Sequence, residues 1–196
     1  MKKQLVFVKN CRLLGHECLP IVIFEKKKMT LIKSISGIRG TIGGIPGENL
    51  TPIDIVESVS AYGFWLKEKF KKKNLKVVIG RDARLSGEMV ENLCIGTLQS
   101  LGIDIINLGL STTPTVEFAV PKEKAHGGII LTASHNPKQW NALKLLNDRG
   151  EFISAKDGEK LLEIIRNNKI YFNDVDELGQ VTPINNYMDN HIEHIV

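Results

Sequence analysis

Short apolar runs of strand length alternate with helical patterns through most of the chain, and this alternation limits the possible folds more than any other feature. Strands separated by helices favour a layered sheet with helices on both faces. The sequence therefore predicts an α/β protein, a three-layer α/β/α domain with a mixed and mostly parallel sheet. The predicted strands lie at 31–36, 76–79, 103–108, 127–131 and 142–146, and the predicted helices run from 52 to the lysines at 71–73, and over 87–101, 114–122 and 154–167.

A serine or threonine stands at the predicted start of each helix, where its side chain can cap the N-terminus. Thr51-Pro52 and Thr113-Pro114 each place the capping residue before a proline, which suits the first helical position. Ser86 and Ser154 are the predicted caps of the other two helices. These signals predict where each helix begins.

Four of the predicted loops follow predicted strands and would share one edge of a parallel sheet. They lie at 37–44, 80–87, 109–114 and 132–137. Ligands of such sheets gather at the carboxyl ends of the strands. We therefore expect the functional site among these loops.

The first two of these loops carry arginines that could meet an anionic ligand. Glycines in 37–44 would let the backbone approach a ligand closely, and Arg39 would offer a guanidinium to phosphate oxygens. A flexible turn with an incidental arginine is the alternative, because the run is neither a Walker loop nor G-x-G-x-x-G. In the second loop we favour internal ion pairing for Arg81 and Asp82, and Arg84 stays open as a loop-anchoring or site-lining residue.

The hexapeptide Thr132–Pro137 places a serine next to a histidine directly after a predicted buried strand. Ser134 stands where α/β proteins place nucleophiles, although Asn136-Pro137 is also a common turn signal. A Ser-His hydrolase is disfavoured, because such enzymes carry Gly-x-Ser-x-Gly, whereas alanine and histidine flank this serine. Adjacent side chains on a strand-like loop also point apart, so His135 is poorly placed as the base.

Composition argues against several other classes of protein. The net charge is +4 over 196 residues, and the lysine runs 26–28 and 71–73 lack interleaved aromatics, so we expect no nucleic-acid partner. No stretch approaches the ~20 apolar residues of a spanning helix, so no membrane partner is expected. Cys11, Cys18 and Cys94 form no CxxC pair, which favours a reducing, cytoplasmic location over a zinc site or a disulfide framework.

The two ends of the chain differ from its centre. Residues 1–28 lack a clear period, and we interpret them as a non-native or disordered extension before a main domain at 29–180. Residues 181–196 are interpreted as a linker and the first helix of a missing second domain. That helix carries His191 and His194, which we assign to its surface because no acidic residue completes a metal motif.

Several segments together resemble one known family. The pieces are Gly37–Gly40, the 80–87 loop, Thr132–Pro137 and Lys144, which lies ten residues beyond the serine. In order and spacing they are similar to the N-terminal domain, domain I, of the α-D-phosphohexomutases, the phosphoglucomutase/phosphomannomutase superfamily. The similarity extends from about residue 29 to the C-terminus and implies the fold of phosphohexomutase domain I.

The resemblance implies that Ser134 is a phosphoserine that donates its phosphoryl group to a hexose phosphate. A bisphosphorylated sugar then forms, reorients and returns its other phosphoryl group to the serine, which interconverts hexose 1-phosphate and hexose 6-phosphate. Hexose 1,6-bisphosphate is accordingly the expected activator. Mg²⁺ is the expected cofactor, with the Ser134 oxygen as one ligand and the other ligands in a missing second domain.

The resemblance also gives roles to the residues around the serine. Lys144 and His135 would complete the catalytic group, and Lys144 is favoured as general acid/base or as a partner of phosphate oxygens. Arg39 would lie near the transferring phosphate. Asn136 and Arg84 are grouped with it as substrate- or phosphate-binding residues, although Asn136 is expected mainly to shape the loop.

One part of the family pattern is missing from this sequence. Members of the superfamily have four domains, and the metal-binding D-G-D-x-D-R pattern of the second domain does not occur here. We therefore expect a truncated enzyme, inactive alone as a mutase, whose partners are a phosphosugar substrate and the remaining mutase domains. The alternative is a non-catalytic phosphosugar-binding or assembly module with the same fold.

Overall fold

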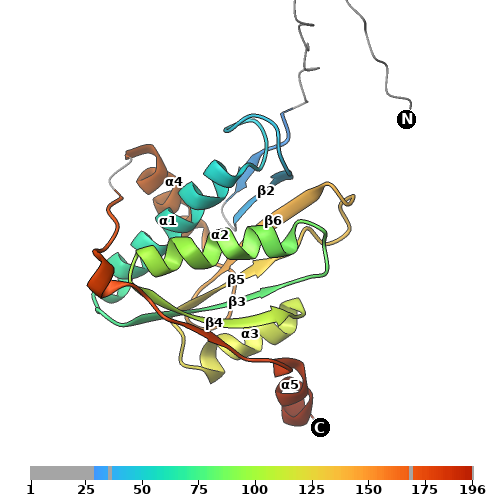
Figure 1. The fold of residues 1–196 in the computed structure, drawn as a ribbon, viewed down its shortest axis with the longest axis vertical. Helices are drawn as coiled ribbons and strands as arrows, with labels where there is room; N and C mark the ends of the chain where they lie inside the picture. The colour runs from blue at the N-terminus through green and yellow to red at the C-terminus, as the bar shows by residue number, and fades with distance from the viewer. Residues whose placement is uncertain (1–28, 35–36, 168–169, 196) are drawn as a thin grey trace, which may run out of the picture.

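A seven-stranded sheet forms the centre of the structure, a computed structural model that describes residues 29–34, 37–167 and 170–195. Helices cover both faces, so the predicted three-layer α/β/α fold is confirmed (Figure 1). The elements are β1 (Ile32–Ser34), β2 (Gly37–Thr41), α1 (Pro52–Phe70), β3 (Leu75–Arg81), α2 (Gly87–Ser100), β4 (Ile103–Leu110), α3 (Thr113–Lys122), β5 (Gly127–Leu131), β6 (Trp140–Leu146), α4 (Ala155–Asn167), a 3₁₀ turn (Val175–Glu177), β7 (Val181–Pro183) and α5 (Tyr187–Ile195).

The strands lie in the order β1-β2-β6-β5-β3-β4-β7, and the sheet is mixed, as predicted. Strands β5, β3, β4 and β7 are mutually parallel, whereas β6 runs antiparallel to both β5 and β2, and β1 antiparallel to β2. Among the described strands, β1 and β6 alone oppose the others. The carboxyl ends of β2, β5, β3 and β4 therefore share one edge, where we expected the functional loops.

The face of the sheet under α1, α2 and α4 carries the larger apolar core. Leu66 and Leu98 contribute from the helices, and Ile79 and Leu143 from the strands, and all are buried. This cluster reaches as far as Ile38 of β2. Helices on this face therefore cover the sheet from β4 across to β2.

The opposite face carries a smaller core under α3 and α5. Val116 and Val120 of α3 pack against Val78 and Ile130 of the sheet. In β6 this second cluster includes Leu146 but no residue nearer the site edge. The second face of β2 and most of β6 is therefore outside the core.

The helix starts largely follow the predicted caps. Thr51 accepts a hydrogen bond from the Asp54 amide in a capping box, and Pro52 opens α1 as expected. The Ser154 hydroxyl accepts from the Asp157 amide at 3.2 Å. The cap of α3 is Thr112, one residue before the predicted position. Ser86 occupies the N-cap position of α2 with helical backbone angles and makes no side-chain cap bond, and its hydroxyl accepts from Asn141.

The prediction that residues 37–44 form a loop is wrong for the first part of this glycine-rich run. Its first five residues form β2, which pairs with β6 from Gly37 opposite Lys144 to Thr41 opposite Trp140. Gly37 has φ +142°, and a Cβ there would lie 1.9 Å from the Leu143 carbonyl oxygen. This glycine therefore serves strand pairing and does not open the backbone to a ligand. Residues 35–36 and the 1–28 extension lie outside the described residues.

The predicted boundary after residue 180 is also revised. Val181–Pro183 pairs in parallel with β4 and forms the edge of the same sheet, so these residues are not a linker. Helix α5 rests on α3, where the His191 ring stacks on Phe118 with ring centroids 4.7 Å apart and contacts the Thr115 hydroxyl at 3.1 Å. His191 is therefore half-buried in a contact between helices. That α5 begins a further domain stays a prediction.

Candidate functional site

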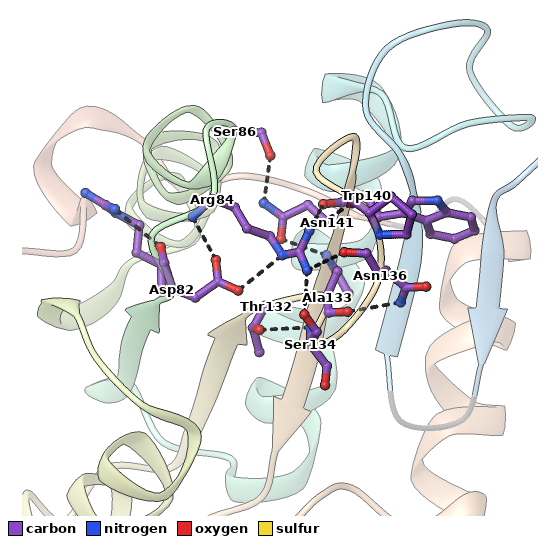
Figure 2. A network of polar contacts seen from close by, with 12 residues as sticks. Asp82, Arg84, Ser86, Thr132, Ala133, Ser134, Asn136, Trp140 and Asn141 are labelled. Atoms are coloured by element: carbon purple, nitrogen blue, oxygen red, sulfur yellow. Dashed lines mark hydrogen bonds and ion pairs between the residues drawn. The ribbon is translucent and has the colours of Figure 1, made fainter. Parts of the chain in front are cut away.

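The loop that joins β5 to β6 presents Ser134 to solvent at the carboxyl edge of the sheet (Figure 2). Ser134 has φ +53°, in the left-handed region that residues other than glycine seldom adopt. Its amide donates to the Thr132 hydroxyl at 3.1 Å. A non-glycine residue in this conformation persists only where its surroundings hold it. The polar contacts of the loop therefore hold Ser134 in this conformation.

Arg84 fills the inside of this loop. Its side chain is 12% exposed, and its Nε donates to Asp82 Oδ2 at 3.2 Å. The two terminal nitrogens donate to four loop carbonyls, those of Pro137 (3.0 Å), Trp140 (3.0 Å), Ser134 (2.6 Å) and Asn136 (2.8 Å). A guanidinium has five N–H donors, and five acceptors surround this one. Of the two roles left open for Arg84, the structure supports loop anchoring, since no donor remains for a phosphate.

Asn136 also holds the turn together. Its side-chain amide and its backbone amide both donate to the Ala133 carbonyl, at 3.0 and 3.1 Å. These two bonds close the turn that contains Ser134. The geometry agrees with the expectation that Asn136 mainly shapes the loop, and a contact with phosphate stays a prediction.

A second anchor, Asn141, was missed by the sequence analysis. Its side chain is fully buried and donates to the Ser86 hydroxyl at 2.9 Å, while its Oδ1 accepts from the Ala142 amide at 2.8 Å. The start of α2 is thereby tied to the far end of the serine loop. The available signal was a polar residue at the head of an apolar strand.

The ion pairs of the 80–87 loop differ from the expected arrangement. Arg81 Nε lies 2.9 Å from Glu91 Oε2 of α2, and Asp82 pairs with Arg84. Arg81 therefore finds its carboxylate ten residues along the chain, on the buried side of the helix. Internal ion pairing within the loop is confirmed for Asp82, whose partner is Arg84, but it is wrong for Arg81, because Glu91 lies outside the loop.

Arg39 and Lys144 share the second face of the sheet beside the serine loop. Arg39 lies opposite Ala142 in the β2–β6 pair, and Lys144, two residues further along β6, points to the same side. The Ala142 carbonyl accepts from the Thr132 amide at 3.1 Å, so Arg39 is level with the start of the serine loop. Arg39 is exposed and Lys144 is half-buried. Two cations thus occupy the part of this face that the core leaves free.

The Lys144 ammonium itself does not lie at the serine. Lys144 is paired with Ile130, four residues before Ser134 along the chain. Its Nζ lies 5.9 Å from the centroid of the Phe152 ring. Burial raises the pKa of Glu117 in α3, while the positive charge of Lys144 acts on it in the opposite sense. In this arrangement the lysine faces α3 and the Phe152 segment.

His135 is exposed next to Ser134. Within the described residues no hydrogen bond joins these two side chains, and Ser134 contacts Thr132 and Arg84 through its backbone. That His135 is not the serine's base stays a prediction. Its part in catalysis stays a prediction.

Side chains that bind metal ions do not cluster within the described residues. No group of three or more histidine, cysteine, aspartate or glutamate side chains within the described residues could hold a metal ion. Mg²⁺ requires about six oxygen ligands, and the serine loop offers the Ser134 oxygen.

The described residues include no helix that is both long and apolar enough to cross a membrane.

The architecture defines a class of protein, an α/β/α domain with an anchored serine loop at the carboxyl edge of its sheet. Residues 31–172 match the family described as phosphoglucomutase/phosphomannomutase, alpha/beta/alpha domain I. The chain belongs to this family. The predicted resemblance is therefore confirmed.

Individual relatives agree with this assignment. The chain is 38% identical over 172 residues to a protein named "Probable phosphoglucosamine mutase" from Methanosphaera stadtmanae, an alignment that covers 84% of this chain and 36% of the relative. It is 40% identical over 126 residues to a "Phosphoglucomutase/phosphomannomutase" from Thermococcus kodakarensis, covering 63% and 27%. The chain thus spans about a third of the length of these relatives.

A solved structure supports the fold independently. The crystal structure of a phosphoglucomutase/phosphomannomutase family protein from Burkholderia thailandensis superposes with a TM-score of 0.67 at 22% sequence identity. The match covers 88% of this chain and 36% of that one. The shared architecture is therefore that of one part of a longer protein.

Proposed function

We propose that Ser134 carries a phosphoryl group in the interconversion of hexose 1-phosphate and hexose 6-phosphate. The observation that supports this most is the serine's placement, exposed on a loop whose backbone is held by Arg84, in a chain whose relatives are named as mutases. Phosphoryl transfer depends on in-line placement and charge neutralisation, so a rigid and accessible oxygen suits it.

In the proposed step, Ser134 Oγ attacks the phosphorus of a sugar bisphosphate. The new bond joins Oγ to phosphorus, the bond from phosphorus to the sugar oxygen breaks, and the departing oxygen takes up a proton. The serine proton passes to a general base. Arg39 would offset charge on the transferring group. Lys144 would serve as acid or base after its flexible stem turns away from Phe152, and His135 would line the site.

The cofactor and the partners belong to the same proposal. Mg²⁺ would supply charge neutralisation, with Ser134 giving one oxygen and the other ligands coming from a second domain. Hexose 1,6-bisphosphate would load the serine. We further propose that the remaining mutase domains are required for turnover and that the protein works in the reducing cytoplasm, where the buried thiol of Cys94 would remain reduced.

Two assays test these statements. The chain alone should not convert glucose 1-phosphate to glucose 6-phosphate, and clear turnover that disappears in Ser134→Ala would overturn the inactivity claim. Exposure to glucose 1,6-bisphosphate should phosphorylate Ser134. A non-catalytic sugar-binding module would bind the bisphosphate without being labelled.

A further inference from the structure

We propose that Asp82 and Arg84 are positioning residues that set the Ser134 oxygen for phosphoryl transfer, and that neither contacts the transferred phosphate. The inference rests on the proposed role of Ser134. It assigns a function to the segment between β3 and α2, which supplies both side chains.

Asp82 connects the strand that delivers the serine to the arginine that holds it. The Asp82 amide donates to the carbonyl of Leu131, the last residue of β5, at 3.0 Å. Its two carboxylate oxygens accept from Arg84, Oδ1 from the backbone amide at 3.1 Å and Oδ2 from Nε at 3.2 Å. The guanidinium is therefore fixed relative to the end of β5.

From that fixed position, Arg84 holds the loop on both sides of His135. One terminal nitrogen, Nη2, donates to the carbonyls of Ser134 and Asn136, at 2.6 and 2.8 Å (Figure 2). These bonds are charge-assisted, because the guanidinium is positively charged, and such bonds are stronger than those between neutral groups. They lie at the point where Ser134 has φ +53°. Because φ and ψ set the direction of the Cα–Cβ bond, the guanidinium limits the positions that Oγ can reach.

Substitution should separate positioning from phosphate binding. All five guanidinium donors have protein acceptors and the side chain is 12% exposed, so Arg84 cannot add a bond to a phosphate without releasing the loop. Lysine keeps the charge but offers a single ammonium, which cannot reach the same acceptors. A positioning residue affects the rate of transfer from bound donor, whereas a phosphate ligand affects the affinity for the donor.

The first experiment measures labelling of Ser134 by radiolabelled glucose 1,6-bisphosphate over a range of concentrations. Arg84→Lys and Asp82→Asn should lower the maximal labelling rate about 100-fold, as expected for a reacting atom displaced by about 1 Å. The half-saturating concentration should change less than about twofold. The matched control is Arg149→Lys, because Arg149 is exposed and pairs with Glu151 at 2.8 Å. An unchanged maximal rate, or a raised half-saturating concentration at an unchanged rate, would overturn the proposal.

The second experiment reports on the loop without any chemistry. The chain has two tryptophans, and Trp65→Phe leaves Trp140, whose carbonyl accepts from Arg84, as the sole indole. In this background Arg84→Lys and Asp82→Asn should raise acrylamide quenching of Trp140 about twofold, and Arg149→Lys should leave it unchanged. If the parent protein is not labelled, the proposed role of Ser134 fails, but quenching still tests whether Asp82 and Arg84 hold the loop. Unchanged quenching in a folded variant of either residue would show that this residue does not hold the loop.

Discussion

The two faces of the sheet share one set of strands but differ in what covers them. On the first face, the core under α1, α2 and α4 extends from β4 to Ile38 of β2. On the second face, the core under α3 and α5 does not extend to β2 and takes in only Leu146 of β6. The larger core of the first face provides most of the stability. The smaller core of the second face leaves Arg39 and Lys144 outside it, beside the serine loop.

The largest effect is expected from the core of the first face. Leu66 is fully buried in α1, so Leu66→Ala should lower the free energy of unfolding by about 2–5 kcal/mol. Denaturant unfolding measures this change. In the Trp65→Phe background, Trp140 emission at low denaturant should not shift on Leu66→Ala, because the serine loop is anchored from α2 and β3. A loss below about 1 kcal/mol would contradict the assignment of this face as the main core.

A smaller effect is expected where a side chain of the first face bonds to the sheet backbone. The Tyr62 hydroxyl donates to the carbonyls of Leu146 (2.6 Å) and Gly128 (3.2 Å), and burial raises its pKa far above the usual range, so it stays protonated. Tyr62→Phe should cost about 1–3 kcal/mol of unfolding free energy.

A double-mutant cycle gives that prediction its control. A Cβ on Gly127 would lie 2.1 Å from the Tyr62 hydroxyl oxygen. Gly127→Ala should therefore destabilise the wild type more than it destabilises Tyr62→Phe. Equal costs in both backgrounds would show that the hydroxyl does not occupy this position.

A pH-dependent effect, smaller again, is expected at the amino edge of the parallel strands. Burial, followed by the charge of Lys72, lowers the pKa of His126 below its ordinary value of 6.5. As the pH falls below 6.5, the unfolded chain takes up this proton before the folded chain does, so stability declines through that window and is fully present above it. His126→Gln should flatten the decline in a series of unfolding curves from pH 7.5 to 5. An unchanged slope would mean that other groups cause it.

The smallest effect on stability is expected on the uncovered face. Arg39→Gln and Lys144→Gln should each change the unfolding free energy by less than about 0.5 kcal/mol. Both should nevertheless slow labelling of Ser134, with Arg149→Gln as the matched control on an exposed turn. If either variant is destabilised by more than about 2 kcal/mol, the second face is part of the structural core and the comparison fails.

Local signals predicted most of the elements but not the long-range pairings. Thr51-Pro52 and the apolar spacing that follows identified α1, because capping and periodicity lie within the helix itself. Strand β2 was missed, because its glycines indicate a loop when they are considered alone. The strand depends on pairing with β6, which lies about 100 residues later in the chain. Strand β7 was missed for the same reason, since its partner is β4.

The candidate site shows the same division. Ser134 and its loop were identified from one hexapeptide, and the fold places them at the expected edge. The anchoring role of Arg84 depends on carbonyls 50 to 56 residues away, so the sequence left two roles open. The buried bond from Asn141 to Ser86 likewise joins residues 55 positions apart, and the polar residue at the start of an apolar strand does not identify its partner.

The most direct test of the account is to locate the phosphate after the chain is incubated with glucose 1,6-bisphosphate and Mg²⁺. Mass spectrometry of the peptide that contains residues 132–137 should find one phosphoryl group on Ser134 in the wild type and none in Ser134→Ala. Ser154→Ala, which changes an exposed serine at the start of α4 and outside the four loops, should be labelled as the wild type is. An unlabelled wild type, or equal labelling of Ser134→Ala, would contradict the claim that Ser134 carries the phosphoryl group.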